Sequence, residues 1–181
     1  MVFAVAMAFI VLFAGEASNG FKHGVAVIVL IVGIVIGAVA GVVSAKKVKM
    51  TDMPQLVSVF NTVGGGAAAL VALNDILTKE GTPDIVVLIT AGLGILIGSV
   101  TFTGSLIAAG KLQGIKWVKK LNLPGKGVWN ILFAVLSVAS LVMLCVQPEQ
   151  RLLWSILTTV FALCYGLVFV IPIGGADMPV V

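Results

Sequence analysis

Asn61 is the side chain with the most capacity for chemistry in a long apolar stretch near the middle of the chain. From Gln55 to Leu73 this stretch carries no charge, and it is long enough to cross a bilayer, which needs about 20 residues. Asn61 lies about 10 Å along the predicted helix. A side-chain amide at that depth must bond to protein or water, because leaving it bare in lipid costs several kcal/mol.

Small and polar residues surround this asparagine on the predicted helix. Asn61, Gly65 and Ala69 recur at intervals of four residues along one face, and Ser58 and Thr62 follow an adjoining face. Two interpretations stay open. The polar groups either join helices by hydrogen bonds or line a water-filled path for an ion or a proton. An amide does not release a proton at neutral pH, so Asn61 can orient water but cannot titrate.

The composition is that of a polytopic membrane protein. Of 181 residues, 60% are hydrophobic and 10% charged, whereas a soluble domain usually carries about 25% charged residues. We therefore expect an all-α fold, a transmembrane bundle of about six spanning helices. The expected spans cover residues 2–14, 24–45, 54–77, 84–109, 127–146 and 151–171.

Small residues predict that the third and fourth spans pack closely against other helices, since glycine lets helix backbones approach. The glycines assigned to this packing are Gly64, Gly65, Gly66, Gly94, Gly98 and Gly104. Asp84 precedes the fourth span and is expected to cap it. The fifth and sixth spans are bulkier and are expected to be more lipid-like, apart from Thr158, Thr159 and Tyr165.

The basic residues predict the orientation in the membrane. Eight of the eleven lysines and arginines lie in the loops that follow the second and fourth spans. These eight are Lys46, Lys47, Lys49, Lys111, Lys116, Lys119, Lys120 and Lys126. By the positive-inside rule these loops face the cytoplasm. The net charge of +4 therefore indicates topology, and no nucleic-acid partner is expected.

No soluble catalytic constellation is found in the sequence. His23 is the only histidine, and Cys145 and Cys164 have no metal-like spacing. The glycines lie in apolar helices and not in a phosphate-binding loop after a strand. We expect no catalytic residue, no metal and no cofactor bound in this segment. Asp52-Met53-Pro54 is repeated by Asp177-Met178-Pro179 before a new apolar run, which predicts that the chain is a fragment.

Three motifs resemble the membrane domain of the β subunit of proton-translocating nicotinamide nucleotide transhydrogenase. They are KKVKMTDMPQLV (residues 46–57), GSVTFTGSLIAAGKLQG (98–114) and IGGADMPVV (173–181). They follow the family's order and approximate spacing, and the resemblance covers the whole chain. It implies that residues 1–181 form a proton-channel domain, with flanking helices and a soluble NADP(H)-binding domain outside this chain.

The resemblance also implies the activity and the partners. The family couples hydride transfer from NADH to NADP⁺ to inward proton movement, with NAD(H) and NADP(H) bound in soluble domains of the intact enzyme. The implied partners are the lipid bilayer, a companion α-type subunit, the soluble domain of the same β chain, and a second αβ unit in a homodimer. The implied location is the bacterial cytoplasmic (inner) membrane, with the lysine-rich loops and both Asp-Met-Pro turns in the cytoplasm.

Residue roles follow from the matching positions. Asn61 stands where several members carry a histidine proposed to carry the proton, while other members instead have a histidine on a helix of the α-type subunit. Ser105 matches a position associated with the proton path. Asp177 matches an acidic residue in the loop that faces the NADP(H) domain, and Asp52 is assigned with it to domain coupling. The predicted polar lining of the path is Asn61, Ser58, Thr62, Thr101 and Ser105.

Two rival classes remain open on the residues alone. A secondary transporter built from repeated helical units fits the repeated Asp-Met-Pro turn, and a purely structural membrane subunit fits the apolar composition. A nucleotide-binding domain encoded downstream of this segment would exclude both.

Overall fold

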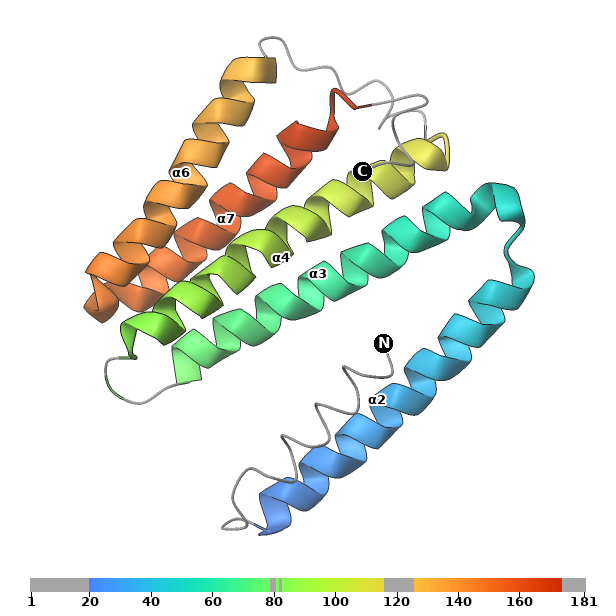
Figure 1. The fold of residues 1–181 in the computed structure, drawn as a ribbon, viewed down its shortest axis with the longest axis horizontal. Coiled ribbons are helices and arrows are strands. Elements are labelled where there is room, and N and C mark those ends of the chain that lie inside the picture. The colour runs from blue at the N-terminus through green and yellow to red at the C-terminus, as the bar shows by residue number, and fades with distance from the viewer. Residues whose placement is uncertain (1–19, 79–80, 82, 116–125, 174–181) are drawn as a thin grey trace. The chain divides into compact units, whose positions relative to one another are not determined.

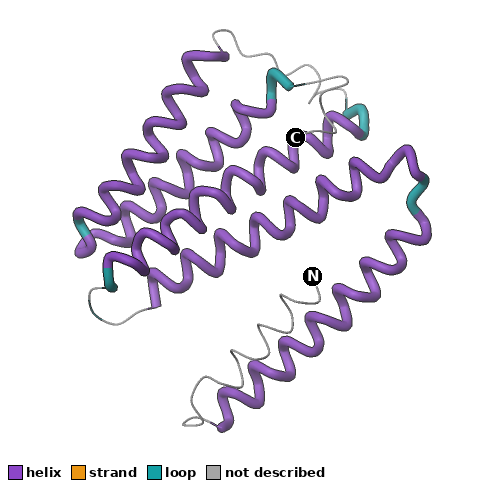
Figure 2. Tube along the Cα trace, in the orientation of Figure 1, coloured by secondary structure: helices purple, strands orange, loops and turns teal. Residues whose placement is uncertain are grey.

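The computed structural model describes residues 20–78, 81, 83–115 and 126–173. Within these ranges the chain forms helices joined by short turns, and no strand occurs among them (Figures 1 and 2). The elements are α2 (Gly20–Lys47), the 3₁₀ turn η1 (Met50–Asp52), α3 (Met53–Thr78), α4 (Ile85–Leu112), α6 (Lys126–Val146), the 3₁₀ turn η2 (Pro148–Gln150) and α7 (Arg151–Val170). The chain divides into two compact units, residues 1–48 and 49–181.

Four described segments are long and apolar enough to cross a membrane. They are Met50–Thr78, Ile85–Leu112, Gly127–Val146 and Pro148–Val170. At about 1.5 Å per residue, each reaches the roughly 30 Å thickness of a bilayer's hydrocarbon core. The predicted all-α transmembrane bundle is confirmed. Each of the last five predicted spans coincides with a described helix to within a few residues, while the first, residues 2–14, lies outside the described residues.

The described part of the first unit is the single helix α2. It extends over 28 residues, more than the predicted span of residues 24–45, and has no acidic residue in its first turn. Lys46 and Lys47 occupy its last turn, where positive charge complements the negative end of the helix dipole.

In the second unit, α4 lies between α3 and α7 and also touches α6 (Figure 1). Successive helices run in opposite directions, so α4 and α7 run parallel to each other. A buried cluster lies near the end where α4 begins: Ile76, Leu88, Ala91, Ile95 and Leu144. A smaller cluster at the opposite end joins Ile107 and Ala108 of α4 to Val170 of α7.

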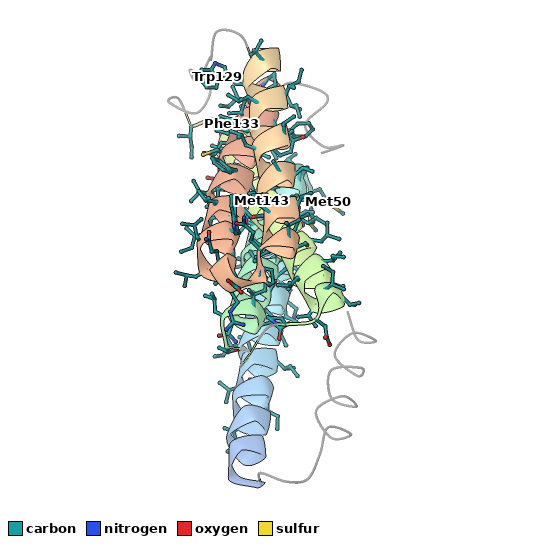
Figure 3. All side chains as sticks on the ribbon, turned by 90° about the vertical axis from the view of Figure 1, so that its left-hand side faces the viewer. Met50, Trp129, Phe133 and Met143 are labelled. Carbon is teal, nitrogen blue, oxygen red and sulfur yellow. The ribbon has the colours of Figure 1, made fainter. Side chains whose placement is uncertain are left out.

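Aromatic side chains and one arginine mark the ends of the bundle. Figure 3 shows Trp129 and Phe133 near the start of α6, where their rings stack at 6.0 Å between centroids. Trp154 lies in the first turn of α7, at the other end of the bundle, and its indole N–H donates to Gln147. Tryptophan is enriched at both membrane interfaces. Beside Trp154, the Arg151 guanidinium donates a 2.7 Å hydrogen bond to the carbonyl of Gly81.

Two local predictions are wrong. Asp84 occupies the position before α4, but its side chain makes no capping hydrogen bond. Its backbone carbonyl accepts from Leu88, while the exposed carboxylate is free to be solvated. The sixth span, α7, is also less lipid-like than expected. Ser155, Ala162 and Gly166, besides the excepted Thr158, are buried on one of its faces, because this helix packs against both α4 and α6.

Candidate functional site

Two glycines bring the backbones of α3 and α4 into direct contact. A Cβ atom placed on Gly98 would lie 2.7 Å from the Gly65 carbonyl oxygen and 2.7 Å from the Ala69 backbone nitrogen. A Cβ on Gly65 would lie 2.9 Å from the Gly98 carbonyl oxygen. Backbone atoms cannot rotate aside as a side chain can. Only residues without a Cβ therefore allow this approach, which places the polar side chains of the two helices within bonding distance.

A polar cluster lies along the same interface, one to two turns toward the start of α3. The Asn61 amide donates to the Ser105 hydroxyl at 2.9 Å. The Ser58 hydroxyl donates to the Ser105 backbone carbonyl at 2.7 Å. The buried Thr62 hydroxyl donates to the Ser58 carbonyl at 2.9 Å, within α3 itself. Ser105 therefore accepts from both Ser58 and Asn61, through two different oxygens.

This cluster borders a cavity of about 390 Å³ between the first turns of α3 and the last turns of α4. The lining residues are Met50, Met53, Pro54, Val57, Ser58, Asn61, Gly104, Ser105, Ala108 and Leu112. One water needs about 10–15 Å³ on this scale, so the cavity has room for several. Asn61 itself is exposed among the described residues, and its carboxamide lies at the edge of this space.

The lining residues determine what the cavity can do chemically. None of those named carries an ionisable side chain. An amide and two hydroxyls supply donors and acceptors but no group that titrates near neutral pH. The amide and hydroxyl groups that line the cavity can therefore hydrogen-bond to water and orient it. None of the lining side chains can bind and release a proton.

Comparison with known proteins decides the family. A sequence model described as "NAD(P) transhydrogenase beta subunit" matches residues 1–181. The chain belongs to the NAD(P) transhydrogenase beta-subunit family. Two relatives from Rhodospirillum rubrum, both named NAD(P) transhydrogenase subunit beta, are each 39% identical over 159 residues. The matches cover 84% of this chain and 34% of each relative, so the chain spans about a third of the length of these relatives.

Not all the path residues expected for this transhydrogenase chain lie at the cavity. Ser58, Asn61 and Ser105 line it, whereas Thr62 and Thr101 do not. The Thr101 side-chain carbons lie beside Gly65, at the glycine contact. The assignment of all five of these residues to the proton path stays a prediction.

Of the two residues assigned to domain coupling, one is described and one is not. Asp52 is exposed in η1, directly before α3. Asp177 lies outside the described residues. Both assignments in this transhydrogenase chain stay predictions.

The remaining predicted packing glycines differ in their surroundings. A Cβ on Gly94 would meet the Ala72 Cβ, and one on Gly66 would meet the Phe102 ring, so both face the partner helix of the α3–α4 pair. Gly104 faces Val170 of α7. A Cβ on Gly64 would meet no described atom within 4 Å.

Sequence reasoning missed the contact between α4 and α7. A Cβ on Gly166 would meet the Val100 carbonyl oxygen at 2.5 Å and would also collide with the Thr103 hydroxyl oxygen. That hydroxyl donates to the Leu163 carbonyl of α7 at 2.9 Å. The available signal was the spacing of small residues at positions 155, 158, 162 and 166, which follows one helix face but is interspersed with bulky side chains.

Proposed function

We propose that this chain is the membrane-spanning, proton-translocating part of an NAD(P) transhydrogenase. It couples inward proton movement to hydride transfer from NADH to NADP⁺ in soluble domains outside this chain. The observation that carries the proposal is the hydrogen-bonded cluster of Asn61, Ser105 and Ser58 beside a cavity large enough for water, in a chain of this family.

The cluster's role in this proposal is to order water. The Asn61 amide and the two serine hydroxyls supply donors and acceptors that hold water in a defined orientation, and a proton moves along such water by exchange of hydrogen bonds. Asn61 does not titrate, so the proton-binding group is assigned to the companion α-type subunit. The family resemblance supports this assignment, because some members carry their membrane histidine there.

Nucleotide binding is assigned to the soluble domains. The dinucleotide fingerprint needs a glycine-rich turn between a strand and a helix, and the described ranges contain helices and turns only. The partners in this proposal are the α-type subunit, the NADP(H)-binding domain of the same chain and a second αβ unit. Linkage then requires reciprocity: if the nucleotide state changes proton affinity, proton binding changes nucleotide affinity by the same factor.

The test uses the intact enzyme in sealed membrane vesicles. An imposed proton gradient directed toward the cytoplasmic face of the membrane should raise the initial rate of NADP⁺ reduction by NADH about tenfold or more. A protonophore should abolish the increase. Vesicles from cells that lack this chain provide the control. A rate that is the same with and without the gradient would contradict the proposal and favour a structural membrane subunit.

The orientation of the bundle is testable separately. A reporter fused after Lys47, or within residues 116–126, should be active in the cytoplasm because these loops carry most of the lysines. A reporter within residues 79–83 should be active on the opposite side. If both positions report from one side, the proposed orientation and the number of spans between them are wrong.

A further inference from the structure

The Lys111 ammonium lies among three backbone carbonyls at the end of α7. It donates to the carbonyl oxygens of Val170 at 2.9 Å, Ile173 at 2.8 Å and Ile171 at 2.5 Å. An ammonium group has three N–H donors, so Lys111 can donate to all three of these carbonyls.

This contact joins two helices that are far apart in sequence. The last carbonyls of a helix have no partner within the helix, and they form the negative end of its dipole. Hydrogen bonds from a charged donor are roughly twice as strong as neutral ones. Lys111 comes from the last turn of α4, about 60 residues before its acceptors, so it binds the end of α7 to the end of α4.

The same end of α4 also bonds to α3. Ser105 accepts from Asn61 and Ser58, and the Leu112 carbonyl accepts from the Gln55 side chain at 3.4 Å. Ser105 and Lys111 are six residues apart, about 9 Å along a helix, and residues 107–110 between them are buried. A displacement of α4 at the polar cluster is therefore carried to Lys111 by a short, packed piece of helix.

We propose that Lys111 is a positioning residue, which couples the polar cluster at the cavity to the end of α7 and the Ile173 carbonyl. This inference rests on the proposed function. Ile173 begins the sequence IGGADMP, in which Asp177, the residue assigned to domain coupling, lies four residues later. Lys111 donates to the Ile173 carbonyl, so a shift of the end of α4 moves Ile173 and the end of α7 with it.

The test compares three substitutions in the intact enzyme in membrane vesicles. Lys111→Met keeps a long side chain but removes the charge and all donors. Lys111→Gln keeps two neutral N–H donors, and Lys111→Arg keeps the charge and the donors. The control is Lys46→Met, the same change at an exposed lysine of α2. Each variant is assayed for protein level in the membrane, for hydride exchange between nucleotides without a gradient, and for stimulation by a proton gradient.

Lys111→Met should lose about tenfold in gradient stimulation while its exchange activity without a gradient stays within about twofold of the unmodified enzyme. Lys111→Gln should be intermediate, and Lys111→Arg and Lys46→Met should stay within about twofold on every measure. The expected order of the Lys111 variants follows the number of N–H donors and the charge that each substituted side chain keeps. A merely structural role would lower protein level and both activities together.

Three results would overturn the inference. They are full gradient stimulation in Lys111→Met, equal loss in the arginine and methionine variants, or parallel loss of protein level and both activities. If Lys111→Met does not accumulate in the membrane, the comparison of Lys111→Gln with Lys111→Arg decides, and equal stimulation in those two overturns the inference. Failure of the proposed function is distinguishable, because the unmodified enzyme would then show no gradient stimulation at all.

Discussion

Replacing Gly98 by leucine should remove most of the folded protein from the membrane. The Gly98 α-carbon faces two backbone atoms of α3, each 2.7 Å from where a Cβ would stand. Neither can rotate away, so the two helices would have to separate. Overpacking a core with side chains that can adjust typically costs about 1–3 kcal/mol, and a collision with backbone should exceed that range. Gly65→Leu should behave in the same way.

The measurement is the yield of monodisperse protein after extraction in mild detergent, together with its thermal unfolding temperature. Gly64→Leu is the matched control, since Gly64 adjoins Gly65 on α3 but has no described atom within 4 Å of an added Cβ. Leu136→Ala on α6, a half-buried position, should also be milder. Equal losses in all of these variants would show that the contact between α3 and α4 is not central to the fold.

Replacing Asn61 by leucine should lower proton-coupled turnover of the intact enzyme by about tenfold or more. The substitution removes the hydrogen bond to the Ser105 hydroxyl and places an apolar group at the edge of the cavity. Hydride exchange in the soluble domains, measured without a proton gradient, should stay within about twofold. Val63→Leu is a control on the same helix, at a side chain that is 65% exposed.

Asn61→His should retain coupled activity, because the family resemblance places histidine at this position in other members. An unperturbed imidazole titrates at about pH 6.5. The variant should therefore gain an additional dependence of coupled rate on pH between about 5.5 and 7.5, when it is compared with the asparagine enzyme. Full coupled activity in Asn61→Leu, in the same assay, would show that water ordered by this amide is not on the path.

Helix positions were predictable because each span combines length with an absence of charge. The run from Gln55 to Leu73 can satisfy its backbone hydrogen bonds in a membrane only as a helix, and α3 includes all of it. The close packing of α3 and α4 against other helices was also predictable, since glycine permits a close approach of helix backbones. Which glycine meets which backbone atom was not predictable, because it depends on how each helix is rotated about its axis.

The bonds within the candidate site were less predictable than the residues that form it. Ser58, Asn61 and Ser105 were all identified from sequence, but the acceptor of the Ser58 hydroxyl is a backbone carbonyl, and every residue has one. Lys111 was interpreted only as a topology signal, because the positive-inside rule accounts for a lysine at a helix end. Its acceptors are also backbone carbonyls, so no residue type near positions 170–173 marks the contact.

The glycine contact between α3 and α4 has a consequence for sliding of one helix along the other. Large side chains that interlock across a helix interface resist axial displacement, and here backbone meets backbone at Gly65 and Gly98. Near Gly65 and Gly98 the axial register is therefore held by the hydrogen bonds that Ser58 and Asn61 make with Ser105, in addition to the packing of Ile76 and Phe102 elsewhere along the interface. Ser58, Asn61 and Ser105 also line the cavity of about 390 Å³. Water competing for the Ser105 hydroxyl would loosen the register, so the hydration of the cavity and the alignment of α3 with α4 are linked through one residue.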